Sequence, residues 1–228
     1  MTLSIVMPAL NEAATIEATL NALQVYRLRG VEIVVADGES SDGTADLARG
    51  RADRVISAPR GRALQMNEGA AKARGDVLLF LHADTLLPGD ADRQIMDGLT
   101  RSGRAWGRFD VRFDASGAMR LVAFAMNWRS RLTGICTGDQ AMFVTRAAFE
   151  MAGGFPPIAL MEDIALSARL KRISRPLCLS ARVTTSARRW QKNGIVRTVL
   201  LMWSLRLRYL LGTDPAKLAR AYRRATRA

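Results

Sequence analysis

Cysteine and histidine are scarce in this chain of 228 residues, which has two cysteines, Cys136 and Cys178, and one histidine, His82. Two cysteines and one histidine are too few for a disulfide scaffold, and they cannot form a zinc site of the usual Cys/His spacing. A reducing compartment is therefore the simpler interpretation. The chain also shows no internal repeat and no low-complexity linker.

Long apolar runs are missing as well. The first residues have no basic region before a short apolar run and soon reach Asn11 and Glu12, so we do not expect a signal peptide. In the most hydrophobic helix candidate, residues 195–211, the longest stretch without a charged residue is 198–205. That stretch is far shorter than the roughly 20 residues that cross a bilayer. We expect a cytoplasmic protein.

Acidic residues are rare near the C-terminus. The net charge is +13, and residues 188–228 hold 11 of the 34 Lys and Arg but only one acid, Asp214. Such a tail can bind nucleic acid, anionic lipid or an anionic substrate, or it can be a solvated helix that keeps the protein soluble. Aromatic residues that stack on bases do not alternate with these arginines, so nucleic acid is not expected. The apolar side of residues 195–211 suits a membrane surface, a dimer partner or the protein core.

Apolar residues make up 49% of the chain and charged residues 24%, which is enough for a folded domain with a sizeable core. In the first hundred residues, short apolar runs alternate with helical patterns. The predicted strands are residues 3–7, 31–36, 53–58 and 77–81. Strands that alternate with helices predict an α/β fold with a Rossmann-like, mostly parallel central sheet flanked by helices.

The second half has a more irregular pattern. Strands are expected over 106–113 and 140–144 and an extended segment over 175–185, with helices over 119–132 and from Glu162 onward. We expect residues 1–100 and 101–190 to be two halves of one domain. Residues 191–228 are expected to form a basic amphipathic helical extension.

Polar residues follow three of the first four predicted strands. Asn11 and Glu12 come after the first, Asp37 after the second, and His82 and Asp84 after the fourth. Ligands bind at the carboxyl ends of the strands in such sheets, so this placement predicts a site.

Each carboxylate also has a plainer interpretation. Asp37 can accept a hydrogen bond from a ring N–H of a nucleobase, or it can stabilise a turn. Asp84 suits Mg²⁺ or Mn²⁺ on a diphosphate, or an ordinary loop. The adjacent Glu162 and Asp163 can act as a general base and a residue that positions it, or they can stabilise the start of a helix through its dipole.

Five segments, in order, carry a resemblance to the family 2 glycosyltransferases with the GT-A fold. They are SIVMPALNE, VVADGESSDGT, GRALQMNEGAAKARGDVLLFLHADT, TGDQAMFV and MEDIALSARL, and they cover roughly residues 3 to 190. The LHADT form also resembles a compact bacterial subgroup that carries an arsenosugar-biosynthesis label.

The resemblance implies a role for each matching residue. Asp163 matches the catalytic base, and Asp84 matches the metal-binding end of an Asp-X-Asp motif. The residues expected to bind the nucleotide sugar are Pro8, Ala9, Asn11, Glu12, Asp37, Arg62 and His82. The residues expected to bind the acceptor are Glu162, Arg188, Arg189 and Trp190. Residues 1–100 would then bind the donor, and residues 101–190 the acceptor.

Three features depart from the family pattern. His82 stands where the first acid of Asp-X-Asp is expected, which leaves Asp84 as the dependable carboxylate ligand. Met66 precedes Asn67 where the family often has Arg, a charge that Arg62 can replace. The Gln-X-X-Arg-Trp motif of processive synthases is absent, although residues 188–190 place Arg-Arg-Trp in a comparable region.

The resemblance thus implies an inverting glycosyltransferase that uses a nucleotide-diphosphate sugar, preferably a UDP-sugar, with Mn²⁺ or Mg²⁺. The acceptor is unknown, and a homodimer is compatible with the sequence. One alternative is a polyprenyl-phosphate sugar synthase at the inner membrane surface, whose acceptor is a lipid phosphate. An alternative of another class is a noncatalytic nucleic-acid-binding protein that uses the basic tail.

Overall fold

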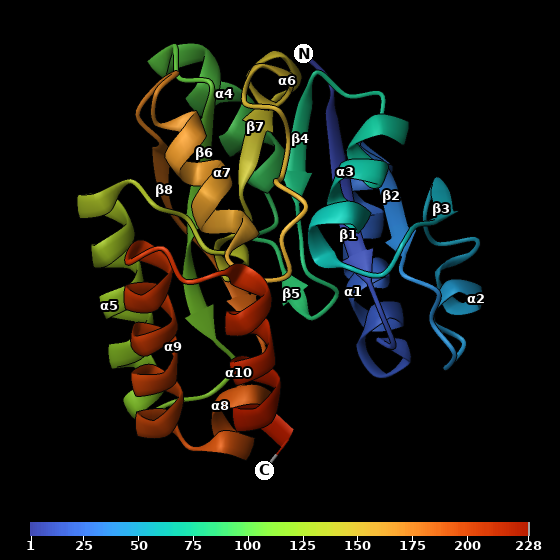
Figure 1. Ribbon diagram of the computed structural model, residues 1–228. Helices are drawn as coiled ribbons and strands as arrows, with labels where there is room; N and C mark the ends of the chain where they lie inside the picture. The colour runs from blue at the N-terminus through green and yellow to red at the C-terminus, as the bar shows by residue number, and fades with distance from the viewer. Residues whose placement is uncertain (228) are drawn as a thin grey trace.

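The computed structural model describes residues 1–227, with all side chains except those of Arg189 and Arg227. Eight strands form one sheet that is flanked by helices (Figure 1). The strands are β1 (Leu3–Ala9), β2 (Glu32–Asp37), β3 (Arg54–Ser57), β4 (Val77–Phe80), β5 (Thr85–Leu86), β6 (Trp106–Phe113), β7 (Phe143–Thr145) and β8 (Leu177–Thr185). The helices are α1 (Ala13–Arg27), α2 (Thr44–Ala48), α3 (Arg62–Lys72), α4 (Ala91–Ser102), α5 (Ala118–Thr133), α6 (Arg146–Met151), α7 (Glu162–Leu170), α8 (Arg188–Asn193), α9 (Ile195–Leu210) and α10 (Pro215–Arg227).

The strand order is β3-β2-β1-β4-β7-β6-β8-β5. The pairs β3–β2, β2–β1, β1–β4 and β6–β8 are parallel, whereas β7 is antiparallel to both neighbours and β5 is antiparallel to β8. The predicted α/β fold with a mostly parallel sheet is therefore confirmed. The strand expected over residues 140–144 is partly wrong, because a 3₁₀ turn occupies Gly138–Gln140 and the strand begins at Phe143.

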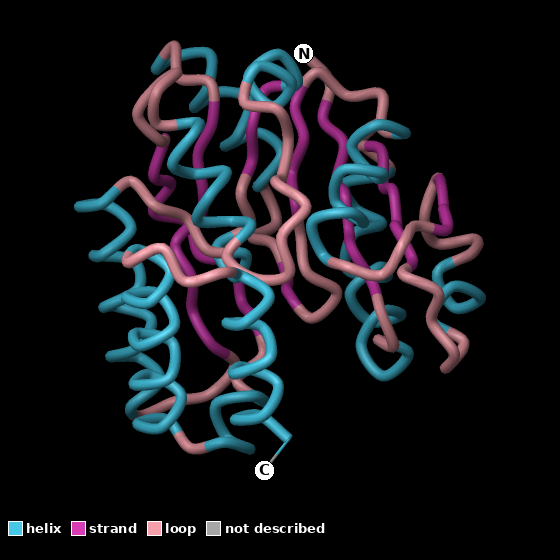
Figure 2. The backbone as a smooth tube through the Cα atoms, viewed as in Figure 1, coloured by secondary structure: helices cyan, strands magenta, loops and turns pink. Residues whose placement is uncertain are grey.

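Helices cover both faces of the sheet, as the cyan segments on either side of the magenta strands show (Figure 2). Alternate residues of β1 point to opposite faces, as in any strand. Ile5 and Met7 join the core cluster that contains α1 and α4. Val6 joins the second cluster, with α3, α6 and α7. Burial on both faces explains why β1 and β4 are apolar almost without interruption.

The parallel register brings the ends of three strands to one edge of the sheet. Ala9 at the end of β1 is paired with Asp37 at the end of β2. Beyond β4, the Leu81 N–H donates to the Val6 carbonyl at 3.0 Å, so His82 emerges at the same edge. The loops after β1, β2 and β4 consequently meet there.

The C-terminal extension consists of α8, α9 and α10. Leu205 of α9 and Leu218 of α10 are buried against Met161, directly before α7. The helix expected over residues 195–211 is present as α9, and α10 adds a second long helix that the sequence did not single out. Within residues 1–227, no helix has the length and apolar character required to span a membrane.

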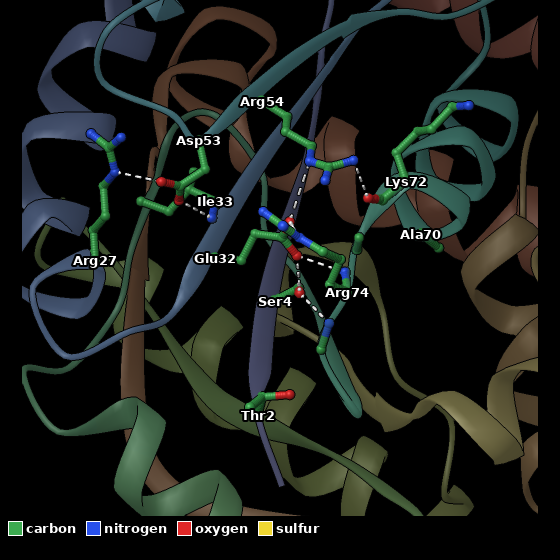
Figure 3. A network of polar contacts seen from close by, with 12 residues as sticks. Thr2, Ser4, Arg27, Glu32, Ile33, Asp53, Arg54, Ala70, Lys72 and Arg74 are labelled. Carbon is green, nitrogen blue, oxygen red and sulfur yellow. Dashed lines mark hydrogen bonds and ion pairs between the residues drawn. The ribbon is translucent and has the colours of Figure 1, made fainter.

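A polar network fastens β1, β2 and the turn before β4 at the opposite edge of the sheet (Figure 3). Glu32 accepts hydrogen bonds from the Ser4 hydroxyl and the Arg74 N–H, both at 2.6 Å. The Ser4 hydroxyl in turn accepts from the Gly75 N–H at 2.8 Å. Gly75 is required here, because a Cβ would lie 2.6 Å from the Ser4 nitrogen. Burial opposes the charge of Glu32, but the hydrogen bonds from Ser4 and Arg74 hold its pKa below the ordinary 4.5.

We predict that Glu32→Gln lowers the free energy of unfolding by about 1–2 kcal/mol at pH 7, because the charge-assisted hydrogen bonds are lost. A depressed folded-state pKa stabilises the fold above the ordinary glutamate pKa, and this contribution disappears as the pH falls through the folded value. The difference between the two proteins should therefore shrink below pH 4.5. Urea unfolding from pH 3 to 7 measures it. Glu68→Gln on the exposed side of α3 is the control, and an equal loss in both variants would contradict the prediction.

Candidate active site

Asp37 is the last residue of β2, and only one of its two carboxylate oxygens has a hydrogen-bond partner. Its Oδ2 accepts a hydrogen bond from the Ser40 N–H at 3.0 Å, which fits the predicted turn. Its Oδ1 is buried and has no hydrogen-bond partner. An unpartnered buried carboxylate oxygen costs free energy unless a ligand supplies a donor. The structure therefore leaves Asp37 able to accept one more N–H.

Gln65 of α3 closes the space beside Asp37. Its Nε2 donates to the carbonyls of Ala9, at 2.6 Å, and Ala36, at 3.1 Å, so the amide joins the ends of β1 and β2. Pro8 and Ala9, both predicted to line the nucleotide, pair with Ala36 and Asp37 in the sheet. Gln65 was not predicted as a site residue.

Asn11 holds two loops together. Its backbone N–H donates to the Ser40 hydroxyl at 2.9 Å, and its side-chain oxygen accepts from the Ser41 N–H at 3.0 Å. Its φ of 55° is in the left-handed region, which asparagine tolerates better than most residues. Asn11 thereby fixes the loop that follows Asp37.

A cleft of about 440 Å³ opens beyond this loop. Glu12, His82 and Asp84 line it from the sheet side, and Arg188 and Trp190 line it from α8. The structure thus gathers into one cleft five side chains from three segments that lie far apart in the sequence. The Arg188 guanidinium is 3.9 Å from the Glu12 carboxylate. The Trp190 ring packs edge-on against Phe113, with 5.7 Å between centroids. The side chain of Arg189 lies outside the described residues.

A second, smaller hollow adjoins the cleft and shares His82 with it. Arg62, Gly138, Glu162 and Asp163 line this hollow. The Gly138 N–H donates to Asp163 Oδ2 at 2.9 Å, which fixes the carboxylate beside the shared histidine. Asp84 and Asp163 therefore line neighbouring hollows that have His82 in common.

His82 itself is held between the two hollows. Its Nδ1 lies 3.6 Å from Asp139 Oδ1. On the other side, a Cβ on Gly138 would come within 2.5 Å of His82 Nε2. A glycine at position 138 therefore allows the loop before β7 to approach the histidine ring.

Glu162 and Arg62 form an ion pair in the small hollow. The closest atoms, Arg62 Nη1 and Glu162 Oε1, are 3.5 Å apart, and the side chains are 45% and 5% exposed. Burial raises the pKa of Glu162, the charge of Asp163 raises it further, and Arg62 opposes both. Burial also disfavours the charge of Arg62, but Glu162, Asp163 and Asp139 raise its pKa above the ordinary value. Arg62 thus stays a fixed positive charge at this site.

Oxygen ligands for a metal ion are few. Across residues 1–227, no three His, Cys, Asp or Glu side chains are grouped so that they hold a metal ion. Asp84 is a hard carboxylate in the cleft, with His82 and Asp139 nearby along its wall. Mg²⁺ is often bound by one or two carboxylates together with substrate phosphates and water. The donor set therefore fits an ion shared with a diphosphate, and does not fit a cage made of protein alone.

Sequence reasoning overlooked Asp139 and the contribution of α10. Asp139 lies in the TGDQ segment that the resemblance includes, but its contact with His82 depends on the 3₁₀ turn. Tyr222 of α10 lines the cleft, although nothing in the local sequence of this basic helix indicates it. Both contacts form between segments that are distant along the chain.

Comparison with protein families and curated proteins agrees with the resemblance seen in the sequence. The model of the family described as glycosyl transferase family 2 matches residues 4–150. Poly-beta-1,6-N-acetyl-D-glucosamine synthase of Staphylococcus aureus is 26% identical over 178 residues, which cover 70% of this chain and 43% of that protein. The chain thus spans less than half the length of this curated relative.

Solved structures share the fold. TarS 1–349 of S. aureus in complex with UDP matches with a TM-score of 0.69 and 18% identity, over 82% of this chain and 60% of that one. The mannosyltransferase PcManGT of Pyrobaculum calidifontis, in complex with GDP-Man and Mn²⁺, has a TM-score of 0.69 and 18% identity, over 96% and 68%. The GT-A fold expected from the sequence is confirmed.

We predict that Gly138→Ala displaces the His82 ring, because the added methyl group would overlap with Nε2. The cost in unfolding free energy should be about 1–3 kcal/mol. His82 is the only histidine in the chain, so its imidazole signals can be followed directly by NMR. Gly89→Ala is the control, since a Cβ there meets nothing within 4 Å. Unchanged His82 signals in Gly138→Ala would refute the close contact.

Proposed function

The chain belongs to glycosyl transferase family 2, and we propose that it transfers a sugar from a nucleotide-diphosphate sugar to an acceptor hydroxyl. One observation carries this proposal: a cleft with Asp84 adjoins a hollow with Asp163, and His82 borders both. A donor diphosphate placed near Asp84 and an acceptor placed near Asp163 would meet at that border.

Asp37 is proposed to bind the base of the donor. Its buried, unpartnered Oδ1 suits the ring N–H of uracil, and the Ser40 N–H holds the other oxygen in place. Guanine offers a similar ring N–H, so Asp37 by itself accommodates both bases. We propose UDP as the nucleotide because the family resemblance favours it, and TarS is a relative in fold with UDP bound. Pro8 and Ala9 would line the same subsite.

Asp84 is proposed as the carboxylate ligand of a divalent cation, Mn²⁺ or Mg²⁺, as the PcManGT complex with Mn²⁺ suggests. When bound, the ion offsets the charge of the donor diphosphate and so favours its departure. Glu12 and Arg188 face the same cleft. Arg62 adds a positive charge on the side of the small hollow.

Asp163 is proposed as the general base. It would take the proton of the acceptor hydroxyl while the acceptor oxygen forms a bond to the anomeric carbon. On the opposite side, the bond between that carbon and the diphosphate oxygen breaks, and the nucleotide leaves with the electron pair. Displacement from opposite sides inverts the anomeric configuration. The Gly138 N–H would keep Asp163 Oδ2 in position during this step.

Glu162 is proposed to position the acceptor and Arg62 rather than to move the proton. It is almost fully buried and paired with Arg62, while Asp163 is only partly buried. Trp190, which lines the cleft against Phe113, is proposed as a surface on which the acceptor packs. Arg188 lies beside it, and Arg189 follows along α8.

We predict that nucleotide binding identifies the donor. Thermal shift with UDP, GDP, dTDP and CDP, each with and without Mn²⁺, should give the largest stabilisation for UDP with Mn²⁺, because ligand binding to the folded state raises the melting temperature. Asp37→Asn should weaken UDP binding about tenfold, as a charge-assisted hydrogen bond is lost. The exposed Asp46→Asn is the matched control. The absence of a response to every nucleotide would contradict the proposed donor.

We predict that Asp163→Asn separates binding from transfer. UDP and Mn²⁺ should bind as in the unchanged protein, while transfer falls by about 10²–10⁴-fold because the general base is lost. UDP release from UDP-sugars, with water and a panel of hydroxyl acceptors, measures turnover. Asp97→Asn on the exposed side of α4 is the control. Near-normal transfer by Asp163→Asn would remove the proposed mechanism.

A further inference from the structure

Apolar side chains gather on the outside of two neighbouring helices, α5 and α9. Sixteen large apolar residues are exposed among the residues described, and ten of them lie on α5, on α9 or directly after α9. They are Leu121, Phe124, Trp128 and Leu132 on the first helix, and Val196, Leu200, Trp203, Leu207, Leu210 and Leu211 on or after the second. We call these ten residues the apolar face. Monomeric proteins rarely expose such a set together, so the face indicates a binding surface.

The two helices run side by side, at the lower left of Figure 1. Met119 and Ala123 near the start of α5 belong to the same apolar cluster as Ile195 at the start of α9. Farther along, Arg129 of α5 lies close enough to Arg206 of α9 for the two charges to interact. The two rows of exposed side chains are therefore neighbours on one side of the molecule.

Arginines border the apolar face on both outer edges. At 3.6 residues per turn, Arg197 and Arg208 lie along the edge of α9 that faces away from Arg206. By the same geometry, Arg120 and Arg131 lie along the edge of α5 that faces away from Arg129. Neither α5 nor α9 contains an Asp or a Glu. The result is an apolar face between two basic borders, with Arg129 and Arg206 half-buried where the two helices meet.

A groove of about 980 Å³ extends the α5 border. Phe124 and Trp128 line it together with Arg120 and Arg182. Its carboxylates are already engaged: Asp110 accepts a bidentate pair of hydrogen bonds from Arg131, and Asp114 accepts from the Ala187 N–H. Four arginines and two aspartates line the groove, so it keeps a net positive charge next to the aromatic side chains.

From this arrangement we propose that the apolar face docks on an anionic phospholipid bilayer. Apolar and tryptophan side chains would enter the interface, and Arg120 and Arg208 on the two borders would contact lipid phosphates, as in helices that lie in the plane of a membrane. Arg131 is paired with Asp110, and Arg197 donates to the Ala225 carbonyl at 3.2 Å. A second copy of the chain fits less well, because two such faces brought together would set basic borders against one another. The proposal does not depend on sugar transfer.

Vesicle binding of the full chain tests the proposal. We expect co-sedimentation with phosphatidylcholine vesicles that contain phosphatidylglycerol, and at least about tenfold weaker binding to phosphatidylcholine alone or at high salt. Leu200→Glu with Leu207→Glu should weaken binding to the anionic vesicles by about tenfold or more, because charges replace buried apolar contacts. Leu121→Glu with Leu132→Glu should act in the same direction.

The matched control is Leu28→Glu with Met151→Glu, which changes two exposed apolar residues outside the face. This variant should bind vesicles like the unchanged protein. Leu200→Ser with Leu207→Ser replaces the glutamate variant if the latter fails to fold, as judged by its melting temperature. Sedimentation without lipid measures self-association.

Tryptophan fluorescence gives an independent readout. Trp128 and Trp203 are exposed, so their emission should shift to shorter wavelength with anionic vesicles and be quenched by brominated lipid acyl chains. Trp128→Phe with Trp203→Phe should remove most of the quenching. Three results would overturn the proposal: no vesicle binding by the unchanged chain, undiminished binding by the α9 variants, or self-association through the face in place of lipid binding.

Discussion

The common direction of β2, β1 and β4 is the constraint from which the site follows. Parallel strands that are each followed by a helix must end at one edge of the sheet, and the loops that leave this edge cannot enter the apolar core. Ala9 and Asp37 are therefore direct neighbours, and His82 emerges beside them. Asn11, in the loop after β1, forms hydrogen bonds with Ser40 and Ser41 in the loop after β2. These bonds fix the loop next to Asp37.

A second constraint is the close approach of Gly138 to His82. The sheet reverses direction at β7, and the 3₁₀ turn before this strand brings Gly138 against the histidine ring. The Gly138 N–H also donates to Asp163, so one residue contacts both the start of α7 and the histidine that follows β4. Any side chain at position 138 would overlap with the His82 ring, which lines both hollows.

The sequence predicts those features that depend on nearby residues. Runs such as residues 77–81 indicate buried strands, and polar residues directly after them, such as Asp37 and Asp84, indicate the site edge. Contacts between distant segments leave no local trace: Gln65 joins β1 to β2 through backbone carbonyls, and Asp139 meets His82 only because of the turn before β7. The strand expected from residue 140 was partly wrong for a local reason: Thr137 and Gln140 cap a 3₁₀ turn with each other, so the strand begins only at Phe143.

In the C-terminal extension, one face of α9 packs on the body of the protein and the opposite face carries exposed apolar side chains. Leu205 on the inner face of α9 is packed beside Met161, the residue before Glu162, and Tyr222 of the adjoining α10 lines the cleft. Trp203 and Leu207 on the outer face of α9 are exposed. Because a helix presents its residues all round its axis, contact with a bilayer on the outer face leaves the inner contacts intact. The inner face of α9 can thus support α10, whose Tyr222 lines the cleft, while its outer face stays available for the proposed docking.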